Sequence, residues 1–269
     1  MNFEELAKIE NESERVNRTY DIFNEDVRLN RSKAARVDFL TTVRYIEKYL
    51  KKGDKILDIG AGAGEYSLYF SRRGYLVSAL ELADANIAAF RNKLTPKDTV
   101  DLVQGNALDL SRYEDHSFDV ILLFGPLYHL QKDTDKQKCI CEAKRVCKKG
   151  GKIFFAFISN DFVFLTEFGY DVHYFSNGDY DKETFRLHDF PFVFHTVEAA
   201  RNLLADGGIH VVHEVASDGA SELLAARINE MSDEDYAQYL RYHFYICEKP
   251  ELLGMSNHLL FVGEPSTGD

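Results

Sequence analysis

Short apolar runs alternate with longer segments of helical periodicity through the middle of the chain. The runs are bounded by Gly, Asp or Lys, and the segments between them repeat apolar residues every three to four positions. The predicted strands cover residues 55–59, 75–81, 100–104, 118–124 and 152–158. The helices predicted between them cover residues 66–73, 86–94 and 133–147. This alternation is typical of a parallel sheet with right-handed crossovers and helices on both faces.

The flanking regions also have the pattern of ordered elements. Apolar positions at helical spacing in residues 3–50 predict two or three helices. Downstream we predict a helix over 197–205, a strand over 209–216, a largely helical region over 220–256 and a last strand over 258–262. No repeat or Pro/Gly/Ser-rich linker separates these parts, so we predict one doubly wound α/β domain with a mostly parallel seven-stranded sheet. Residues 1–50 would form a helical lid of the same domain, and residues 51–269 its ligand-binding body, with insertions at about 160–195 and 220–256.

Composition limits the classes of partner. The chain has 269 residues and a formal net charge of −12, and non-specific nucleic-acid binding needs Lys and Arg to displace counterions. Four cysteines are too few for a disulfide scaffold in a chain of this length, which favours a reducing compartment. The acidic N-terminus and the absence of an apolar run near about 18 residues give no sign of a leader or membrane span. We expect a cytoplasmic monomer or homodimer with no nucleic-acid or membrane partner.

Glycines stand at positions 60, 62 and 64, directly after the first predicted strand. Glycines at such a turn let the backbone approach a ligand at a helix N-terminus, where amide groups point outward. A dinucleotide-binding loop reads G-x-G-x-x-G, whereas these glycines alternate, and the carboxylates of Asp58 and Glu65 flank the turn. Both carboxylates would repel a pyrophosphate. They suit a ligand that carries an ammonium and a sulfonium, as S-adenosylmethionine (SAM) does.

Polar residues also end the next two predicted strands. Glu81 follows Gly60 by 21 positions and ends the second strand, where an acid can accept hydrogen bonds from both ribose hydroxyls. After the third strand, Gly105 precedes Asn106 and Ala107, which places an amide side chain where an adenine edge would lie. The three strand ends together predict an adenosyl-binding site.

In these motifs the sequence resembles the class I SAM-dependent methyltransferases over about residues 55–160. The resemblance rests on the glycine loop, Glu81, the 105–107 turn, the apolar strand 118–123 and the 148–151 segment. It implies a Rossmann-like methyltransferase fold with a reversed strand near the end of the sheet, SAM as cofactor and S-adenosylhomocysteine (SAH) as product. The family often has Asp where Asn106 stands. The resemblance assigns to the cofactor Tyr20, as part of a lid, and Asp58, Gly60, Ala61, Gly62, Gly64, Glu81, Leu82, Asn106, Ala107, Phe124 and Gly125.

Candidate catalytic residues follow the fourth predicted strand. Methyl transfer from a sulfonium is an in-line displacement with an activated leaving group, so orientation can supply much of the rate and a base is optional. Tyr128 and His129 lie at the carboxyl edge, where open α/β sheets bind ligands, and are our catalytic candidates. The alternative is that His129 caps the next helix and Tyr128 packs on the cofactor. No metal is predicted, because the histidines lack zinc-site spacing and Cys139 and Cys141 point to different helix faces.

Residues 160–195 are unusually rich in Phe and Tyr. Placed after the fifth parallel strand, they could form a lid whose rings shape an acceptor pocket and exclude water. They could equally form a second small core or a dimer contact, and the sequence leaves these interpretations open.

The leading functional hypothesis is transfer of a methyl group from SAM to a small-molecule N or O acceptor, mainly by orientation in a closed pocket. An RNA or protein methyltransferase is an alternative, although the paired prolines of adenine amino-methylases are absent from the loop at 125–128. A dinucleotide-dependent oxidoreductase is disfavoured by the glycine spacing and Glu65. A non-catalytic SAM-binding regulatory protein is a further alternative, because catalysis by orientation leaves no obligatory acid or base in the sequence.

Overall fold

The computed structural model describes residues 3–23 and 25–266. Its described strands form one eight-stranded sheet in the order β3-β2-β1-β4-β5-β8-β7, with β6 beside β5. Strands β1 to β5 run parallel, whereas β8 is antiparallel to both β5 and β7. This confirms the doubly wound, mostly parallel sheet and its reversed strand. The strands are β1 (Lys55–Ile59), β2 (Leu76–Glu81), β3 (Val100–Gln104), β4 (Phe118–Leu123), β5 (Cys147–Ser159), β6 (Phe194–His195), β7 (Ile209–Ala216) and β8 (His258–Pro265).

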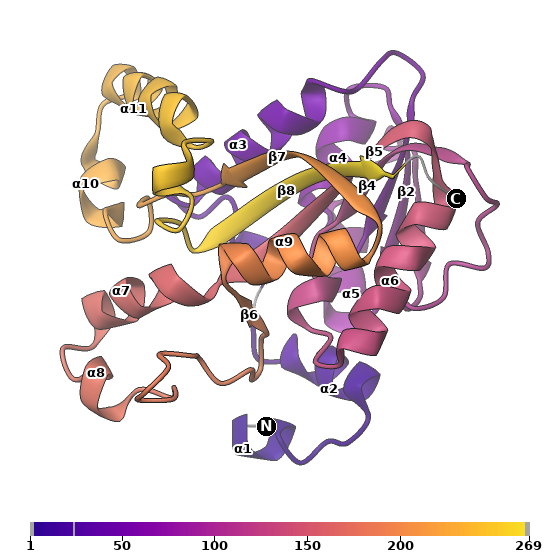
Figure 1. Ribbon diagram of the computed structural model, residues 1–269. Helices are drawn as coiled ribbons and strands as arrows, with labels where there is room; N and C mark the ends of the chain where they lie inside the picture. Colours follow the sequence, from indigo (N-terminus) through magenta and orange to yellow (C-terminus); the bar gives the residue numbers. More distant parts are fainter. Residues whose placement is uncertain (1–2, 24, 267–269) are drawn as a thin grey trace.

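Helices connect these strands and flank the sheet (Figure 1). Within the described residues, no helix is both long enough and apolar enough to cross a membrane. The α-helices are α1 (Phe3–Leu6), α2 (Glu12–Thr19), α3 (Arg36–Glu47), α4 (Glu65–Ser71), α5 (Asp84–Lys93), α6 (Asp133–Val146), α7 (Asn160–Tyr170), α8 (Tyr174–Asn177), α9 (Val197–Asp206), α10 (Ala225–Glu230) and α11 (Asp233–Ile246). The short 3-10 helices are η1 (Glu25–Val27), η2 (Pro126–Tyr128) and η3 (Pro250–Leu252).

The unbroken apolar run of β4 reflects burial on both faces of the sheet. Val120 and Leu122 pack in the cluster that contains α3 and α4 side chains. Ile121 and Leu123 point the other way, into the cluster formed with α6 and α9. All four are at most 1% exposed, as expected for a parallel strand with helices on both sides.

Strand β5 begins earlier than predicted. Cys147, expected at the end of a helix, already pairs with Phe118, and the register shifts before Lys152 pairs with Val120. The segment between them, expected as a turn into the strand, is an irregularity inside it. Gly150 has φ +79°, a left-handed conformation that costs little without a Cβ. The glycines therefore mark a bulge in the strand.

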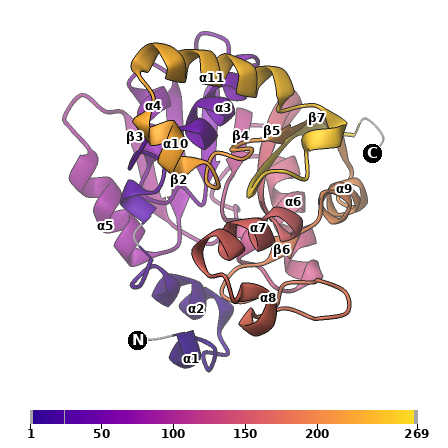
Figure 2. The ribbon, with the colours of Figure 1, turned by 90° about the vertical axis from the view of Figure 1, so that its left-hand side faces the viewer.

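The parallel arrangement brings the carboxyl ends of β1 to β4 to one edge of the sheet. Helix α2 lies at this edge, near the bottom of the view in Figure 2, whereas α11 runs along the top. Only part of residues 1–50 reaches this edge, whereas the whole segment was expected to form a lid there. Helix α3 instead joins the core, with Val37, Phe39 and Val43 at most 4% exposed. The loops at the edge carry most of the residues that the sequence singles out.

Candidate active site

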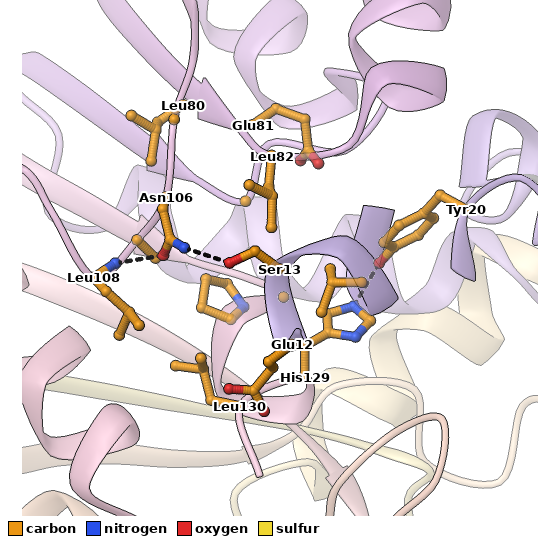
Figure 3. A pocket seen from close by; sticks show the side chains of 16 residues that line it. Glu12, Ser13, Tyr20, Leu80, Glu81, Leu82, Asn106, Leu108, His129 and Leu130 are labelled. Carbon is orange, nitrogen blue, oxygen red and sulfur yellow. Dashed lines mark hydrogen bonds between the residues drawn. The ribbon is translucent and has the colours of Figure 1, made fainter. Parts of the chain in front are cut away.

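A cleft with about 590 Å³ of empty space opens at this edge, between α2 and the loops after β1 to β4 (Figure 3). The residues that line it are Glu12, Ser13, Val16, Tyr20, Gly60, Leu80, Glu81, Leu82, Gly105, Asn106, Ala107, Leu108, Gly125, Pro126, His129 and Leu130.

Most of the predicted site residues meet at this cleft. Those in its wall are Tyr20, Gly60, Glu81, Leu82, Asn106, Ala107, Gly125 and His129. The others lie behind the wall or beyond it, namely Asp58, Ala61, Gly62, Gly64, Phe124 and Tyr128. Sequence reasoning missed the polar residues that α2 contributes, Glu12 and Ser13, and it also missed Val16. Ser13, Val16 and Tyr20 have helical three- and four-residue spacing, but nothing in the sequence says which surface that face covers.

The amides of the glycine loop donate hydrogen bonds within the protein. The N–H groups of Gly60 and Ala61 donate to the Leu80 carbonyl at 2.8 and 3.1 Å, and the Gly64 N–H donates to the Ala61 carbonyl at 2.9 Å. The Gly62 N–H donates to Oε2 of Glu81 at 2.7 Å. The outward-pointing amides expected from sequence are therefore not free at these four positions. A phosphate-binding loop needs such donors, so the geometry disfavours a dinucleotide.

The glycines are required by close packing. A Cβ on Gly60 would lie 2.6 Å from the Phe124 carbonyl oxygen, and one on Gly64 would lie 2.4 Å from the Phe90 ring. Their φ angles of +76° and +84° are also unfavourable for other residues. The loop thereby packs directly against the end of β4 and against α5, and Gly60 forms part of the cleft floor.

Glu81 ends β2 and is 5% exposed. Its Oε2 accepts the Gly62 N–H, and its Oε1 accepts the Ala83 N–H at 2.8 Å. Burial raises the pKa of this carboxyl group, and the backbone donors oppose the shift. Oε1 also accepts a long hydrogen bond of 3.4 Å from the Asn86 side-chain amide. Oε2 keeps a second lone pair and the side chain lines the cleft, so Glu81 can also accept a hydrogen bond from a ligand hydroxyl (Figure 3).

Asp58 lies behind the glycine loop and is 1% exposed. Its Oδ2 accepts the Ser67 hydroxyl at 2.7 Å. Its Oδ1 is buried and has no hydrogen-bond partner in the part of the chain that the structure describes. Burial raises the pKa of Asp58 to about 7, and the Ser67 hydroxyl opposes this shift. An orphaned buried acceptor beside the loop fits a cationic ligand group, because an ammonium would supply the missing donor.

Glu65, the second carboxylate expected to border the ligand, has a different role. Its Oε1 pairs with the Lys93 ammonium at 2.6 Å, and its Oε2 accepts a hydrogen bond from Asn30. Its charge is therefore compensated outside the cleft wall. The electrostatic argument against a pyrophosphate rests on Asp58 and Glu81 instead.

Helix α2 closes the cleft through polar contacts. The Asn106 side-chain amide donates to the Ser13 hydroxyl at 2.9 Å, and its oxygen accepts the Leu108 N–H at 2.9 Å (Figure 3). The amide expected at an adenine edge is thus already bonded to α2. Asn17 bonds reciprocally with the side chain and backbone of Asp84.

The two catalytic candidates line different cavities, although their ring centroids lie only 5.2 Å apart. Tyr20 and His129 share a 2.7 Å hydrogen bond between the hydroxyl and Nε2, while Nδ1 of His129 is buried without a partner among the described residues. Burial lowers the pKa of His129 to about 4, so the ring is neutral. This arrangement suits anchoring of the lid better than proton transfer. Tyr128 instead lines a neighbouring cavity together with Phe124, and burial raises the pKa of its hydroxyl.

No residue of the aromatic segment 160–195 lines the cleft. Phe164, Tyr180 and Leu187 form a small cluster of their own, which matches the second-core interpretation. Phe192 is different, because its ring centroid lies 5.3 Å from that of His129. Within residues 3–23 and 25–266, no three His, Cys, Asp or Glu side chains are grouped as a metal site would require.

Comparison with known proteins agrees with this geometry. Residues 57–155 match the family model described as a methyltransferase domain. A ubiquinone/menaquinone biosynthesis C-methyltransferase, UbiE of Xylella fastidiosa, is 31% identical over 144 residues, covering 51% of this chain and 53% of that protein. The chain therefore spans about half the length of the curated relatives it matches.

Solved structures share the fold over nearly the whole chain. The PH0226 protein of Pyrococcus horikoshii has a TM-score of 0.60 at 20% identity, covering 93% of this chain and 99% of that one. The [4+2]-cyclase SpnF has a TM-score of 0.62 at 17% identity, covering 95% and 97%. The name of SpnF shows that a protein with this fold can catalyse a different reaction, so function has to be argued from the site. The matched segment contains the glycine loop, Glu81, Asn106 and the loop after β4, and residues 57–155 are therefore a methyltransferase domain of the class I SAM-dependent family, whose cofactor is SAM.

Proposed function

We propose that the chain transfers a methyl group from SAM to a small-molecule acceptor. The observation that carries this proposal is the pair of buried carboxylates at the cleft, Glu81 in its wall and Asp58 with an unsatisfied oxygen behind the loop. A ligand with ribose hydroxyls and an ammonium satisfies both. When bound, SAM supplies a methyl group already activated on a sulfonium.

In this proposal, different residues bind different parts of the cofactor. Glu81 would hold the ribose and Asp58 the ammonium, with the methionine part against Gly60, Ala61, Gly62 and Gly64. Leu82, Asn106 and Ala107 would face the adenine, and Phe124 and Gly125 would border the sulfonium. Tyr20 would close the lid through its hydrogen bond to His129. Adenine binding at Asn106 would require α2 to give up the Ser13 contact or to share it.

The protein's contribution to rate would be alignment and exclusion of water. Helix α2 already covers the cleft, which leaves room for a small acceptor. The net charge of −12 disfavours an RNA acceptor. The UbiE relatives are named C-methyltransferases, so they support methyl transfer without favouring the N or O acceptor expected from sequence. A cytoplasmic setting and a monomeric or homodimeric state stay predictions.

The test is release of SAH from SAM by the full chain with a panel of small amines, phenols and carboxylates. We expect release above the acceptor-free rate with at least one class, and its loss in Glu81→Ala. SAM binding without release from any acceptor would support the non-catalytic alternative. The absence of both SAM binding and SAH release would contradict the proposal as a whole.

A further inference from the structure

A second cavity lies on the other side of the loop that follows β4. Phe124 and Tyr128 line it, whereas Gly125 and His129 of the same loop line the cofactor cleft. An adjoining hollow of about 480 Å³ shares Arg28, Asp38 and His258 with it. The loop that would border the sulfonium therefore lines both the cofactor cleft and this second cavity.

His258, the first residue of β8, is held in this cavity by a carboxylate. Its Nδ1 lies 2.7 Å from Oδ2 of Asp218, which is 6% exposed. The other oxygen of Asp218 accepts the Ser256 hydroxyl at 2.5 Å and the His258 backbone N–H at 3.1 Å. A carboxylate at Nδ1 keeps the proton of the neutral ring on that nitrogen and leaves a lone pair on Nε2.

The free nitrogen of His258 is accessible from the cavity. Its side chain is 26% exposed although the residue lines both hollows, and Nε2 has no hydrogen-bond partner in the part of the chain that is described. A second histidine–carboxylate pair, on the neighbouring strand β7, has no such free nitrogen. His213 pairs with Glu248 at 2.5 Å, but the Tyr49 hydroxyl caps its Nε2 at 2.7 Å.

The remaining walls limit what the cavity can take. Tyr66, Phe124 and Tyr128 present aromatic rings, and Leu259 and Leu260 add apolar surface. The Arg28 guanidinium brings a positive charge, although it is paired with Glu25 at 2.7 Å and Asp38 at 3.4 Å. Flat apolar walls with a free base and a cation suit a compact planar molecule that becomes negatively charged when it loses a proton.

We propose that this cavity binds the methyl acceptor, that the acceptor is a small phenol or enol, and that His258 is the catalytic base. The inference rests on the proposed methyl transfer. The acceptor O–H bond breaks and its proton passes to Nε2 of His258. An O–C bond forms to the transferred methyl group as the methyl–sulfur bond breaks, with that electron pair remaining on sulfur. Asp218 is a positioning residue, which fixes the ring and stabilises its cation.

The charges around His258 suit this role. Burial lowers its pKa, but the Asp218 carboxylate, as charge and hydrogen-bond partner, and the Asp38 carboxylate raise it more, with Arg28 opposing. The pKa of His258 therefore stands above its usual value. Burial raises the pKa of the Tyr66 and Tyr128 hydroxyls, which stay neutral and do not compete as bases. Arg31 and Glu222 complete the charged groups of the adjoining hollow.

Para-nitrophenol tests the proposal directly, because its phenolate has a distinct visible absorption band. The full chain is saturated with SAH and titrated into the phenol about two pH units below the pKa of the free phenol, where only about 1% of the free phenol is ionised. We expect binding with growth of the phenolate band, as the proton moves to His258. In His258→Gln the ionised fraction should fall at least about tenfold relative to wild type, since a shift of one pKa unit is tenfold in the ratio of the two forms. His213→Gln is the matched control and should leave the band unchanged.

Three outcomes would overturn the inference. They are failure of para-nitrophenol to bind, binding without ionisation, and an equal phenolate band in His258→Gln. Asp218→Asn keeps hydrogen-bonding groups beside Ser256 and the ring, and should lower the ionised fraction without abolishing binding. SAH affinity, measured by calorimetry on every variant, reports folding and the cofactor cleft. Intact SAH binding with no phenol ionisation would reject His258 as the base while leaving the proposed methyl transfer in place.

Discussion

Three acidic side chains around one turn differ in what surrounds them. Glu81 faces the cleft and is hydrogen-bonded by two backbone amides. Glu65 forms an ion pair with Lys93 away from the cleft. Asp58 is buried with one unsatisfied oxygen. Their types and positions are visible in the sequence, but the partners that decide their roles come from α5, from Ser67 and from backbone amides. The sequence therefore predicts the acids of the site without separating them.

Glu81→Ala should weaken SAM binding by about 1–3 kcal/mol, because a charge-assisted hydrogen bond to the ribose is lost. Calorimetry on the full chain measures this. Glu65→Gln removes a carboxylate at the same loop that does not line the cleft, and should leave the affinity within error. Equal losses in the two variants would contradict the assignment of Glu81.

Asp58 should make SAM binding depend on pH. In the folded apo protein the pKa of Asp58 is about 7, above the ordinary 3.8, because burial favours the neutral carboxyl group. The stability that this neutral group contributes at low pH is lost as the pH rises through about 7. A cofactor ammonium would favour the charged form. We therefore expect SAM affinity to rise by up to about tenfold as pH increases from about 6 to about 8, because over this range the Asp58 carboxyl group goes from roughly one-tenth to roughly nine-tenths ionised in the apo protein. Asp58→Asn should flatten this rise, and an unchanged profile in that variant would count against the contact.

At the scale of elements, two segments shape the cleft for different physical reasons. The turn from β1 to α4 is fixed by packing, since Gly64 lies against the Phe90 ring. Helix α2 is attached largely through hydrogen bonds to Asn106, Asp84 and Gln131. Periodicity predicts both helices, but it does not show that α2 covers the cleft or that residues 148–151 lie inside β5, because those facts depend on the partner surface and on strand pairing.

Gly64→Ala and Gly74→Ala separate packing from backbone strain. Both glycines have left-handed φ angles, +84° and +88°, but only at Gly64 would the alanine methyl group meet other atoms within 4 Å. Each substitution should cost about 1–2 kcal/mol for the backbone. Gly64→Ala should cost a further ~1–3 kcal/mol from overpacking against Phe90. Urea unfolding measures both values, and equal losses would contradict the packing argument.

Helix α2 should open to admit the cofactor and close upon binding. Limited proteolysis of the full chain should show cleavage around residues 12–30 that SAM suppresses, because polar-anchored surface elements open locally at low cost. Helices α7 and α8 form a separate small cluster and should be cleaved at the same rate with and without SAM. Protection of α7 and α8 without protection of α2 would contradict this assignment of the lid.

At the scale of the whole molecule, the sheet assembles a site from residues far apart in sequence. Its parallel order and the reversed β8 could be predicted, because runs such as β4 are continuously apolar and the glycine loop identifies the first crossover. The second cavity could not be predicted from the sequence. His258 and Asp218 meet only because β7 and β8 pair antiparallel at the edge where β5 ends, and no local pattern records that meeting. The sequence thus predicts the cofactor cleft better than the acceptor cavity.

Every role assigned above requires that the cleft bind a cationic adenosyl ligand and not a dinucleotide. Calorimetric titration of the full chain with SAM and, separately, with NAD distinguishes these two ligand classes. We expect saturable one-site binding of SAM and no measurable binding of NAD, because the loop amides already donate within the protein and Asp58 lacks a donor among the described residues. Saturable binding of NAD without binding of SAM would contradict this assignment of the cleft.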